Sequence, residues 1–300
     1  MKKLLLIGGG TIATHYKQGL RLSPNYELVA LADINPRCAA REVFDVPFYT
    51  DYNAALSSGA EVALISTSTG AHYDIARSLL NSGIAVITEK PMCDSYDKVE
   101  ALCSLAKRKK IDLGCVFHWI YADEVRFLKQ HLADFGSIRR ITVRICDDYA
   151  NTSTGTIDTT RRGLAGAWLD SGINAFSYVG ELIDLRNYKL QLMEEEIDSV
   201  SSQAKYARRV FTFGEVSVDI AIDWRTASRS KTAEIECDNG LVQVNHTEQR
   251  VLFNGKVVYD NPVPDRLSAH YLNAFAEFTL NKQQLQRTLL LHKILFERSK

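Results

Sequence analysis

The sequence predicts an α/β protein of two domains, in which a parallel sheet alternating with helices precedes an α+β domain with a large, mostly antiparallel open sheet. Three observations predict this fold. An unbroken apolar run at 4–7 precedes a glycine-rich turn, strand and helix patterns alternate as far as residue 118, and long alternating strands follow. The length of 300 residues also favours two domains, which we place at 1–118 and 119–300.

The first element is a buried strand that leads into a phosphate-binding turn. Residues 4–7 are all apolar, as in a central parallel strand covered on both faces. In the G-x-G-x-x-A spacing that follows, Gly8 permits a tight turn, Gly10 lets the backbone approach a pyrophosphate, and Ala13 allows close packing of helix on strand. A helix opening at Thr11 would point its N–H groups at the phosphates. We therefore expect a dinucleotide cofactor to contact Gly8, Gly10, Thr11, Ile12 and Ala13.

An acidic residue ends the second predicted strand, at residues 27–32. Asp33 lies at the distance from the glycine turn where a Rossmann domain binds the adenosine ribose through its hydroxyls. The alternative is that Asp33 caps the helix beginning near Pro36. A carboxylate here repels a 2′-phosphate, although Arg37 nearby can offset that repulsion, so we expect NAD, with NADP tolerated.

The Rossmann alternation continues to residue 118. Ligands of such a sheet bind outside the carboxyl ends of its strands, which places Ser66, Thr67 and His72 on the cofactor side. For His72 the alternative is a structural hydrogen bond in the first turn of a helix. We expect helices at 37–44, 52–58, 73–80 and 96–109, and strands at 61–67, 84–88 and 111–117.

The triplet Glu89-Lys90-Pro91 follows the fifth predicted strand. Pro91 keeps Lys90 out of helical geometry and holds it extended at the strand end. The ammonium group would then project toward the place where a nicotinamide lies, and Glu89 beside it is a candidate cofactor contact. A lysine at a strand end is ordinarily a solvated charge, but the flanking glutamate and proline single this one out.

After Tyr121 the pattern changes to one amphipathic helix at 121–132 and then to long strands. Residues 216–224 alternate apolar and polar side chains, as in a half-buried strand. Asn239-Gly240 and Asn254-Gly255 each lie between apolar runs and predict hairpin turns. Helices at 266–280 and 282–297 close the chain and could pack back on the first domain.

The composition argues against several classes of partner. Basic and acidic residues number 36 each, giving zero formal charge and no basic stripe for nucleic acid or an anionic membrane. The apolar part of the N-terminal run is too short for a signal peptide, and no segment is long enough to span a membrane. The six scattered cysteines lack zinc spacing and indicate reduced thiols, a cytoplasmic location and no structural metal.

Together with the glycine turn and Asp33, two motifs make the chain resemble the glucose-fructose oxidoreductase and inositol dehydrogenase family, Gfo/Idh/MocA, over essentially its full length. In that family the E-K-P triplet, here Glu89 to Pro91, follows the nicotinamide strand and supplies an active-site lysine. The segment 166–174 is similar to the family's glycine-rich entry to a helix, which carries an aspartate and a histidine four apart. The resemblance implies an NAD(P)-dependent oxidoreductase acting on a sugar.

Asn174 occupies the family's histidine position. An amide does not titrate, so the acid/base role of that histidine cannot pass to it. The string D-x-G-I-N-A resembles the aldose 1-dehydrogenase branch, which oxidises L-arabinose or D-galactose at C1. The aromatic-His-x-x-Tyr segment at 117–121 resembles the same branch and makes His118 a substrate-binding candidate. Trp119-Ile120 and Ser171 stand where that branch has Ser-Arg and Pro, so the identity of the sugar stays undecided.

The resemblance implies that Lys90, Asp170 and Asn174 act on the substrate. Asp170 and Asn174 are four residues apart and share one face of a helix. Lys90 would hydrogen-bond the reacting oxygen, Asp170 would act as the base, and Asn174 would orient the hydroxyl, with a lactone as the product. In the alternative, Asp170 caps the helix and Asn174 lies on a solvated face. The apolar residues around the pair favour a buried helix.

Three further questions of function stay open. Arg161 and Arg162 lie on a Thr- and Gly-rich loop at 151–166 that could form a lid, and they are either solvated charges or a grip for a phosphate or carboxylate. In the second case the substrate is a sugar phosphate or a nucleotide-linked sugar, and the enzyme a dehydrogenase or ketoreductase; inositol is a further family substrate. Some relatives bind dinucleotide and sugar as non-catalytic sensors. The resemblance also implies a homodimer or homotetramer formed through the second sheet.

Overall fold

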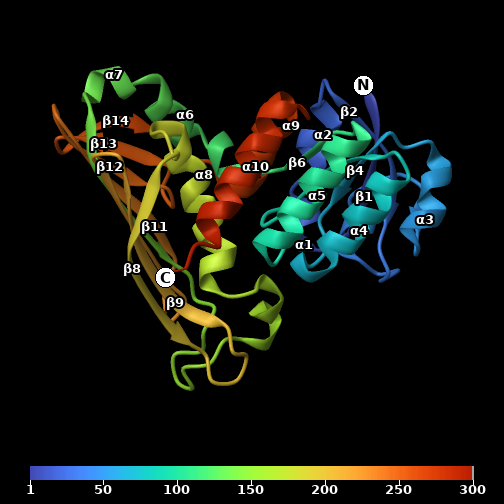
Figure 1. Ribbon diagram of the computed structural model, residues 1–300, viewed down its shortest axis with the longest axis horizontal. Coiled ribbons are helices and arrows are strands. Elements are labelled where there is room, and N and C mark those ends of the chain that lie inside the picture. Colours follow the sequence, from blue (N-terminus) through green and yellow to red (C-terminus); the bar gives the residue numbers. More distant parts are fainter. Residues whose placement is uncertain (299–300) are drawn as a thin grey trace. The chain divides into compact units, whose positions relative to one another are not determined.

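The computed structural model describes residues 1–298, without the side chains of Arg161 and Arg162. The chain divides into two compact units, each built on one sheet (Figure 1). Unit 1 comprises residues 1–121 and 265–293, and unit 2 comprises residues 122–264 with the segment that follows from Ile294. The two closing helices therefore fall largely in unit 1.

Unit 1 has a six-stranded parallel sheet in the order β3-β2-β1-β4-β5-β6, which confirms the predicted Rossmann topology. Helices α4 and α5 lie side by side, and α2 packs against α9 (Figure 1). The strands are β1 Lys2–Ile7, β2 Tyr26–Ala32, β3 Phe48–Tyr49, β4 Val62–Ile65, β5 Ala85–Thr88 and β6 Leu113–Cys115. The helices are α1 Thr11–Thr14, α2 Lys17–Leu22, α3 Tyr52–Ala55, α4 Thr69–Asn81, α5 Tyr96–Lys109, α9 Arg266–Glu277 and α10 Lys282–Leu295.

Two predicted helices of unit 1 differ from the structure. The helix expected to open at Thr11 is a single turn, and a second helix begins at Lys17, because Tyr16 between them is fully buried and hydrogen-bonded to Glu89. The helix expected at 37–44 is a 3₁₀ turn at Ala39–Glu42. The apolar runs of β1 and β4 are buried as predicted.

Unit 2 has an eight-stranded sheet in the order β14-β13-β12-β11-β7-β10-β9-β8. All its neighbouring strands are antiparallel except β7 and β10, which run parallel. The strands are β7 Ile138–Cys146, β8 Tyr188–Ile197, β9 Ala204–Phe213, β10 Val216–Asp223, β11 Ser230–Cys237, β12 Gly240–Asn245, β13 Arg250–Phe253 and β14 Lys256–Asp260. The helices are α6 Asp123–Gln130, α7 Leu132–Phe135 and α8 Ile173–Leu182, with a π-helical turn at Trp168–Gly172 before α8.

The eight-stranded sheet has one face along which α6 and α8 lie, here called the inner face (Figure 1). Alternate residues of its strands are buried there, and Phe176 of α8 packs edge-on against Phe211 of β9. The opposite, outer face is polar: Asp219 receives hydrogen bonds from the guanidinium groups of Arg144 and Arg208. This alternation gives the sheet the half-buried character that residues 216–224 predict.

Both predicted hairpins exist, one of them displaced by a residue. Asn254 and Gly255 have φ values of 50° and 77°, as a two-residue turn with both central residues left-handed requires. In the other hairpin Cys237 pairs with Gly240, so the loop is residues 238–239. None of the helices described is both long and apolar enough to cross a membrane.

Candidate active site

The glycine turn after β1 leaves room for a ligand to approach its backbone. Gly8 has φ +98°, and a Cβ there would lie 2.6 Å from backbone atoms of Ser66 and Thr67. Gly10 is exposed with φ −68°, and a Cβ there would meet no protein atom within 4 Å. Gly8 is thus needed by the backbone itself, whereas the space beside Gly10 fits a pyrophosphate. Because α1 is one turn long, its dipole adds little, and the backbone N–H groups are the main donors.

The three side chains after Gly10 differ in exposure. Thr11 is exposed and Ile12 is half-buried, whereas Ala13 is fully buried. Ala13 therefore serves the packing role that the third glycine position predicts. A contact of Thr11 or Ile12 with the cofactor remains a prediction.

Asp33 follows β2 and holds the glycine turn. Its Oδ2 accepts the Gly9 N–H at 2.6 Å, and its Oδ1 accepts the Asn35 N–H at 2.7 Å. The capping alternative is wrong, because the next helical turn begins only at Ala39 after Cys38, and Asp33 closes a local turn instead. Each carboxylate oxygen has a second lone pair that a ribose hydroxyl can use, so the ribose role remains open to it. Arg37 is exposed close by.

Two predicted cofactor residues brace the strand ends. Ser66 is buried and its Oγ donates to Gly8 O at 2.7 Å, while Thr67 is half-buried. His72 is 1% exposed, with Nε2 3.0 Å from Thr67 O and Nδ1 3.2 Å from Pro91 O. Burial lowers the pKa of His72 in spite of these two carbonyl oxygens. His72 therefore joins the loops after β4 and β5, as its structural alternative predicts.

Lys90 follows β5 on a loop that Glu89 anchors. Glu89 is 5% exposed, and its Oε1 accepts the hydroxyl protons of Tyr16 at 2.8 Å and Tyr271 at 2.6 Å. Its Oε2 accepts the Lys90 N–H at 3.1 Å. Burial and the charge of Glu89 raise the pKa of both tyrosines, so they stay protonated donors. Glu89, predicted as a cofactor contact, is thus tied to Lys90 and to α9, and Lys90 itself is half-buried.

The same loop is fixed beyond Pro91. The Met92 N–H donates to His292 Nε2 at 2.8 Å, and His292 Nδ1 donates to Thr288 O at 2.7 Å. The acceptor role of Nε2 requires a neutral ring, and burial lowers the pKa of His292 to about 4. The backbone carrying Lys90 is therefore preorganised by residues from distant parts of the chain. Sequence reasoning missed Tyr16, Tyr271 and His292, because only the fold brings them to this loop.

His118 lies inside unit 1, paired with another histidine. Its Nδ1 is 3.1 Å from Nδ1 of His270, the two rings stack at 5.4 Å, and both side chains are buried. The pair links the end of the Rossmann segment to α9. A contact of His118 with substrate remains a prediction.

Asp170 and Asn174 lie in unit 2 on the helix that the sequence predicts. Asp170 lies within the π-helical turn and its own N–H donates to Gly166 O at 3.1 Å, so the capping alternative is wrong. Asn174 is 8% exposed and its Nδ2 lies 3.4 Å from Asp170 O, so a solvated face is wrong too. Such π turns inside helices are frequent at functional sites. Because Lys90 belongs to unit 1, its meeting with this pair remains a prediction.

Sequence reasoning missed a buried ion pair close to Asp170. Asp147, which follows β7, is 3% exposed and forms a salt bridge with Lys231 of β11 at 2.5 Å. Burial raises the pKa of Asp147, Lys231 opposes the rise, and the charge of Asp170 adds to it. Asp147 and Lys231 are 84 residues apart, so no spacing in the sequence indicates the pair.

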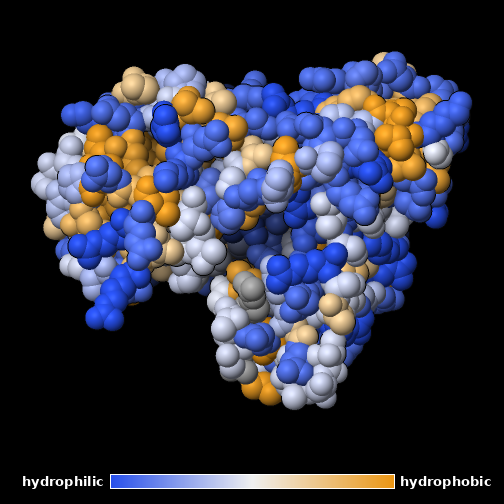
Figure 2. Space-filling model, turned by 180° about the vertical axis from the view of Figure 1, so that it is seen from behind, coloured by the Kyte–Doolittle hydropathy of each residue, from blue (hydrophilic) through white to orange (hydrophobic). Residues whose placement is uncertain are grey.

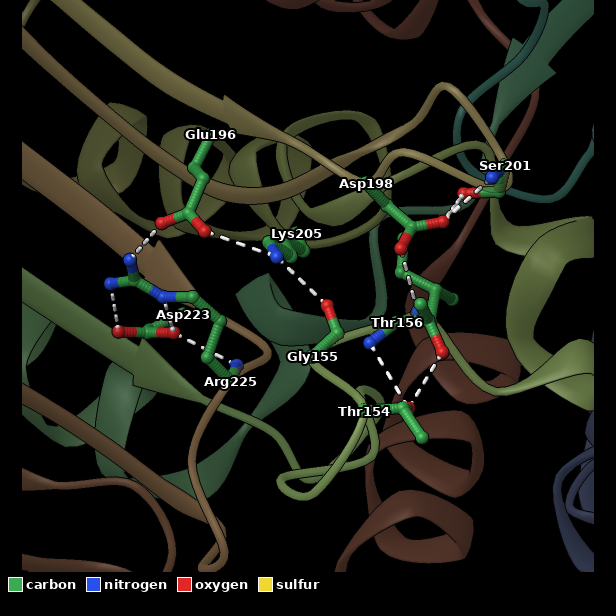
Figure 3. A network of polar contacts seen from close by, with 10 residues as sticks. Thr154, Gly155, Thr156, Glu196, Asp198, Ser201, Lys205, Asp223 and Arg225 are labelled. Atoms are coloured by element: carbon green, nitrogen blue, oxygen red, sulfur yellow. Dashed lines mark hydrogen bonds and ion pairs between the residues drawn. The ribbon is translucent and has the colours of Figure 1, made fainter.

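The loop at 151–166 is held by hydrogen bonds to strands of its own unit (Figure 3). Lys205 Nζ donates to Gly155 O at 2.8 Å and pairs with Glu196 at 3.0 Å. The Ile157 N–H donates at 3.2 Å to Asp198, whose other oxygen accepts from Ser201. The first half of the predicted lid is thus anchored. The side chains of Arg161 and Arg162 lie outside the described part of the chain, so their grip on an anion remains a prediction.

Residues 1–298 contain no group of three or more His, Cys, Asp or Glu arranged to hold a metal ion. All six cysteines are free thiols, buried or half-buried.

Comparison with known proteins connects this geometry to one family. Residues 2–116 match the family model named GFO_IDH_MocA, described as an oxidoreductase family with an NAD-binding Rossmann fold. The chain is 26% identical to the "Putative oxidoreductase YceM" of Salmonella typhimurium over 72% of its length and 66% of that relative. It is 27% identical to glucose-6-phosphate 3-dehydrogenase of Bacillus subtilis over 71% of its length and 59% of that relative. These matches thus span less than two thirds of either relative.

A solved structure matches the fold across both units. KijD10, a 3-ketoreductase from Actinomadura kijaniata determined in an open conformation with TDP-benzene and NADP, has a TM-score of 0.80 at 15% identity. The match covers 98% of this chain and 95% of that one. At this identity the likeness concerns the fold alone.

Proposed function

We propose that the chain is an NAD(P)-dependent sugar dehydrogenase of the Gfo/Idh/MocA oxidoreductase family, whose model, described with an NAD-binding Rossmann fold, matches residues 2–116. The observation that carries the proposal is the position of Lys90, on a loop after β5 that Glu89 and His292 hold rigid. The open space beside Gly10 and the two oxygens of Asp33 fit the pyrophosphate and ribose of the cofactor.

In this mechanism Lys90 donates a hydrogen bond to the reacting sugar oxygen as negative charge develops on it. Asp170 takes up the hydroxyl proton, and Asn174 orients the same hydroxyl through its amide. Bound NAD supplies the redox chemistry by accepting the hydride from the sugar carbon. The protein's own residues thus position the substrate and handle its proton.

We propose the C1 hydroxyl of an aldose as the group that is oxidised, giving a lactone. The support is the string at 170–175, which keeps the aspartate and replaces the family's histidine by Asn174. An anomeric hydroxyl is more acidic than an ordinary alcohol, so its proton is removed without a histidine. For the cofactor, Asp33 favours NAD over NADP, and exposed Arg37 leaves NADP tolerated.

A second candidate is oxidation or reduction at C3 of a sugar phosphate or nucleotide-linked sugar. The activities of two similar proteins favour it, since one is a glucose-6-phosphate 3-dehydrogenase and the other a 3-ketoreductase. Arg161 and Arg162 would then contact the phosphate. Oxidation of an inositol and non-catalytic sensing of dinucleotide and sugar are the two remaining candidates.

The test follows NADH absorbance with the purified protein and a panel of free aldoses, inositols and sugar phosphates, supplied with NAD and NADP separately. Turnover on free aldoses supports C1 oxidation, and turnover on phosphorylated or nucleotide-linked sugars alone supports the second candidate. Binding of NAD and sugar without NADH formation supports the sensor.

The variant Lys90→Met removes the ammonium and keeps the length of the side chain. We expect kcat/KM to fall about a hundredfold or more, because a preorganised donor to a developing oxyanion is lost. Cofactor affinity should stay unchanged. The matched control is Lys98→Met, which removes a partly exposed lysine paired with Asp94 on α5. Turnover that survives in Lys90→Met would contradict the role assigned to Lys90.

A further inference from the structure

Charged and polar residues terminate the apolar rows on the inner face of the eight-stranded sheet. On β7 the inner row runs Ile141, Val143, Ile145 and then Asp147, and on β11 the pairing partner of Ile145 is Lys231. Apolar side chains would be expected there. On β10 the row of buried residues 218, 220 and 222 continues to Trp224. One end of the inner face is therefore polar where the rest is apolar.

The ion pair between Asp147 and Lys231 is costly to bury. The side chains are 4% and 16% exposed, and the Nζ–Oδ1 distance is 2.5 Å. Buried ion pairs gain little stability over apolar residues of similar volume, because desolvation offsets their attraction. An apolar pair at this place would stabilise the core equally well. Recognition of a ligand would explain why a charged pair is present instead.

Helix α8 and the turn before it present a second polar row. Asp170, Asn174 and Tyr178 are spaced by four and share one helix face. The Tyr178 ring packs edge-on against His246 at 4.9 Å, and His246, next on the inner face after β12, bonds Glu124 of α6 at 2.9 Å. The π-helical turn that carries Asp170 contacts β9 and β10 of the sheet. The helix row therefore lies against the polar end of the sheet.

This layer contains buried polar atoms with unused hydrogen-bonding capacity. Asn174 Oδ1 and Trp224 Nε1 are both buried, and neither has a hydrogen-bond partner within the described residues. Each such atom is costly unless a partner is supplied. The amide oxygen of Asn174 is an acceptor and the indole N–H of Trp224 is a donor. A hydroxyl group can both donate and accept, so hydroxyl groups can satisfy both atoms.

We propose that Lys231, held by Asp147, together with the amide of Asn174, forms a hydroxyl-binding wall that selects the sugar. The inference rests on the proposed function, because it places the wall beside the carbon on which Asp170 acts. Lys231 has three N–H donors and uses one on Asp147, which leaves donors for substrate oxygens. Asn174 Oδ1 accepts from a hydroxyl of the same sugar.

The charges of this wall indicate a neutral substrate at this end of the site. Lys231 is neutralised by Asp147, and the neighbouring Arg229 is neutralised by Asp148. Asp170 then adds a negative charge that repels an anion. The wall thus recognises adjacent hydroxyls of an uncharged sugar rather than a phosphate.

The test compares Lys231→Met with Asp148→Asn, which breaks the neighbouring exposed ion pair and leaves the wall intact. The probes are D-galactose, D-glucose and L-arabinose with saturating NAD. For a sugar that the wild-type protein oxidises, we expect Lys231→Met to raise KM about tenfold or more, with kcat and NAD affinity little changed. Asp148→Asn should leave KM, kcat and the affinity for NAD unchanged.

Two further variants separate recognition from folding. Lys231→Arg keeps the ion pair and should restore part of the lost affinity. The double variant Asp147→Asn, Lys231→Met leaves no unpaired buried charge and should fold while still failing to bind sugar tightly. A folded Lys231→Met protein whose KM equals that of the wild type would overturn the proposal.

A wild-type protein that oxidises none of the probes would count against the proposed function. In that case, sugar binding without turnover tests whether the wall exists. Saturation-transfer NMR with the same sugars and NAD detects binding without turnover. Sugar signals that appear with the wild type and vanish with Lys231→Met support the wall. Equal signals with both proteins, or none with the wild type, overturn it.

Discussion

At the residue scale, Lys90 owes its position to side chains that the sequence does not place near it. The E-K-P triplet identifies Lys90 from three consecutive residues. Tyr271, however, which anchors Glu89, lies 182 residues from Glu89 in the sequence. The same is true of His292, which is 200 residues from Met92. Local patterns predict which residue carries the charge. They cannot predict the tertiary contacts that fix it, because those depend on where α9 and α10 pack.

The variant Tyr271→Phe tests the anchor. It removes one hydroxyl that donates to the Glu89 carboxylate and leaves the ring packed against Tyr16. A hydrogen bond to a charged group contributes about 1.5–3 kcal/mol, so we expect that loss in urea unfolding. We also expect kcat to fall about threefold to tenfold, because Lys90 is held less firmly. The control is Tyr96→Phe, a half-buried tyrosine on α5; equal losses in the two variants would refute the anchor.

The neutral ring of His292 makes stability depend on pH. Its pKa is about 4 in the fold against about 6.5 in the unfolded chain, so the unfolded state binds the proton more readily. The contribution is therefore complete above about pH 6.5 and is lost as the pH falls toward 4. Between about pH 7 and pH 5 we expect the wild type to lose about 2 kcal/mol more than His292→Gln in urea unfolding. Parallel pH profiles for the two proteins would exclude this linkage.

At the element scale, periodicity predicts the Rossmann sheet and fails where one side chain interrupts a helix. The parallel sheet is confirmed, because buried parallel strands read as unbroken apolar runs, whereas the order of its strands comes from the structure alone. The helix from Thr11 ends after one turn because Tyr16 points inward to Glu89. Likewise no sequence pattern predicts the π turn at 168–172, although the spacing of Asp170 and Asn174 correctly places both on one helix. Asp147 and Lys231 are invisible to any local pattern.

The glycine turn permits a prediction that separates cofactor binding from folding. In Gly10→Ala the new methyl group meets no protein atom within 4 Å and the backbone angle is ordinary. We expect unfolding to stay within about 0.5 kcal/mol of the wild type, while the Kd for NAD rises about tenfold or more, because the methyl group occupies the ligand's space.

Gly8→Ala is the matched comparison in the same turn. There a Cβ would lie 2.6 Å from the Ser66 backbone at φ +98°, so we expect both stability and NAD binding to be lost. Calorimetric unfolding and NAD titration measure both variants. A Gly10→Ala protein that binds NAD as tightly as the wild type would show that the cofactor does not approach this turn.

At the scale of the whole molecule, the polar outer face of the eight-stranded sheet is the surface where we expect subunits to meet. It carries the half-buried cluster of Arg144, Asp219 and Arg208 and no helix among the described residues. Figure 2 shows apolar side chains gathered over the β13–β14 end of this sheet, where Val257 and Val258 are 55% and 40% exposed. Exposed apolar residues on an edge strand favour association.

We therefore predict that the protein is a homodimer or homotetramer in light scattering, and that Thr142→Glu shifts it toward the monomer. Thr142 lies half-buried on the central strand β7, facing outward between Glu234 and Asp219. A third carboxylate there adds like charge at the expected interface. The control is Ser228→Glu, in an exposed bend after β10. A monomeric wild type would refute association through this face.

The central claim is hydride transfer from a sugar carbon to NAD, and isotope transfer measures it most directly. The protein is incubated with NAD and an aldose carrying deuterium at C1, or in parallel at C3, and the NADH is examined by mass spectrometry. We predict deuterium in the NADH from the C1-labelled aldose. Label from the C3-labelled sugar alone would retain the dehydrogenase and move the reacting carbon. Absence of deuterium from NADH with both substrates, with sugar consumed or not, would contradict the account.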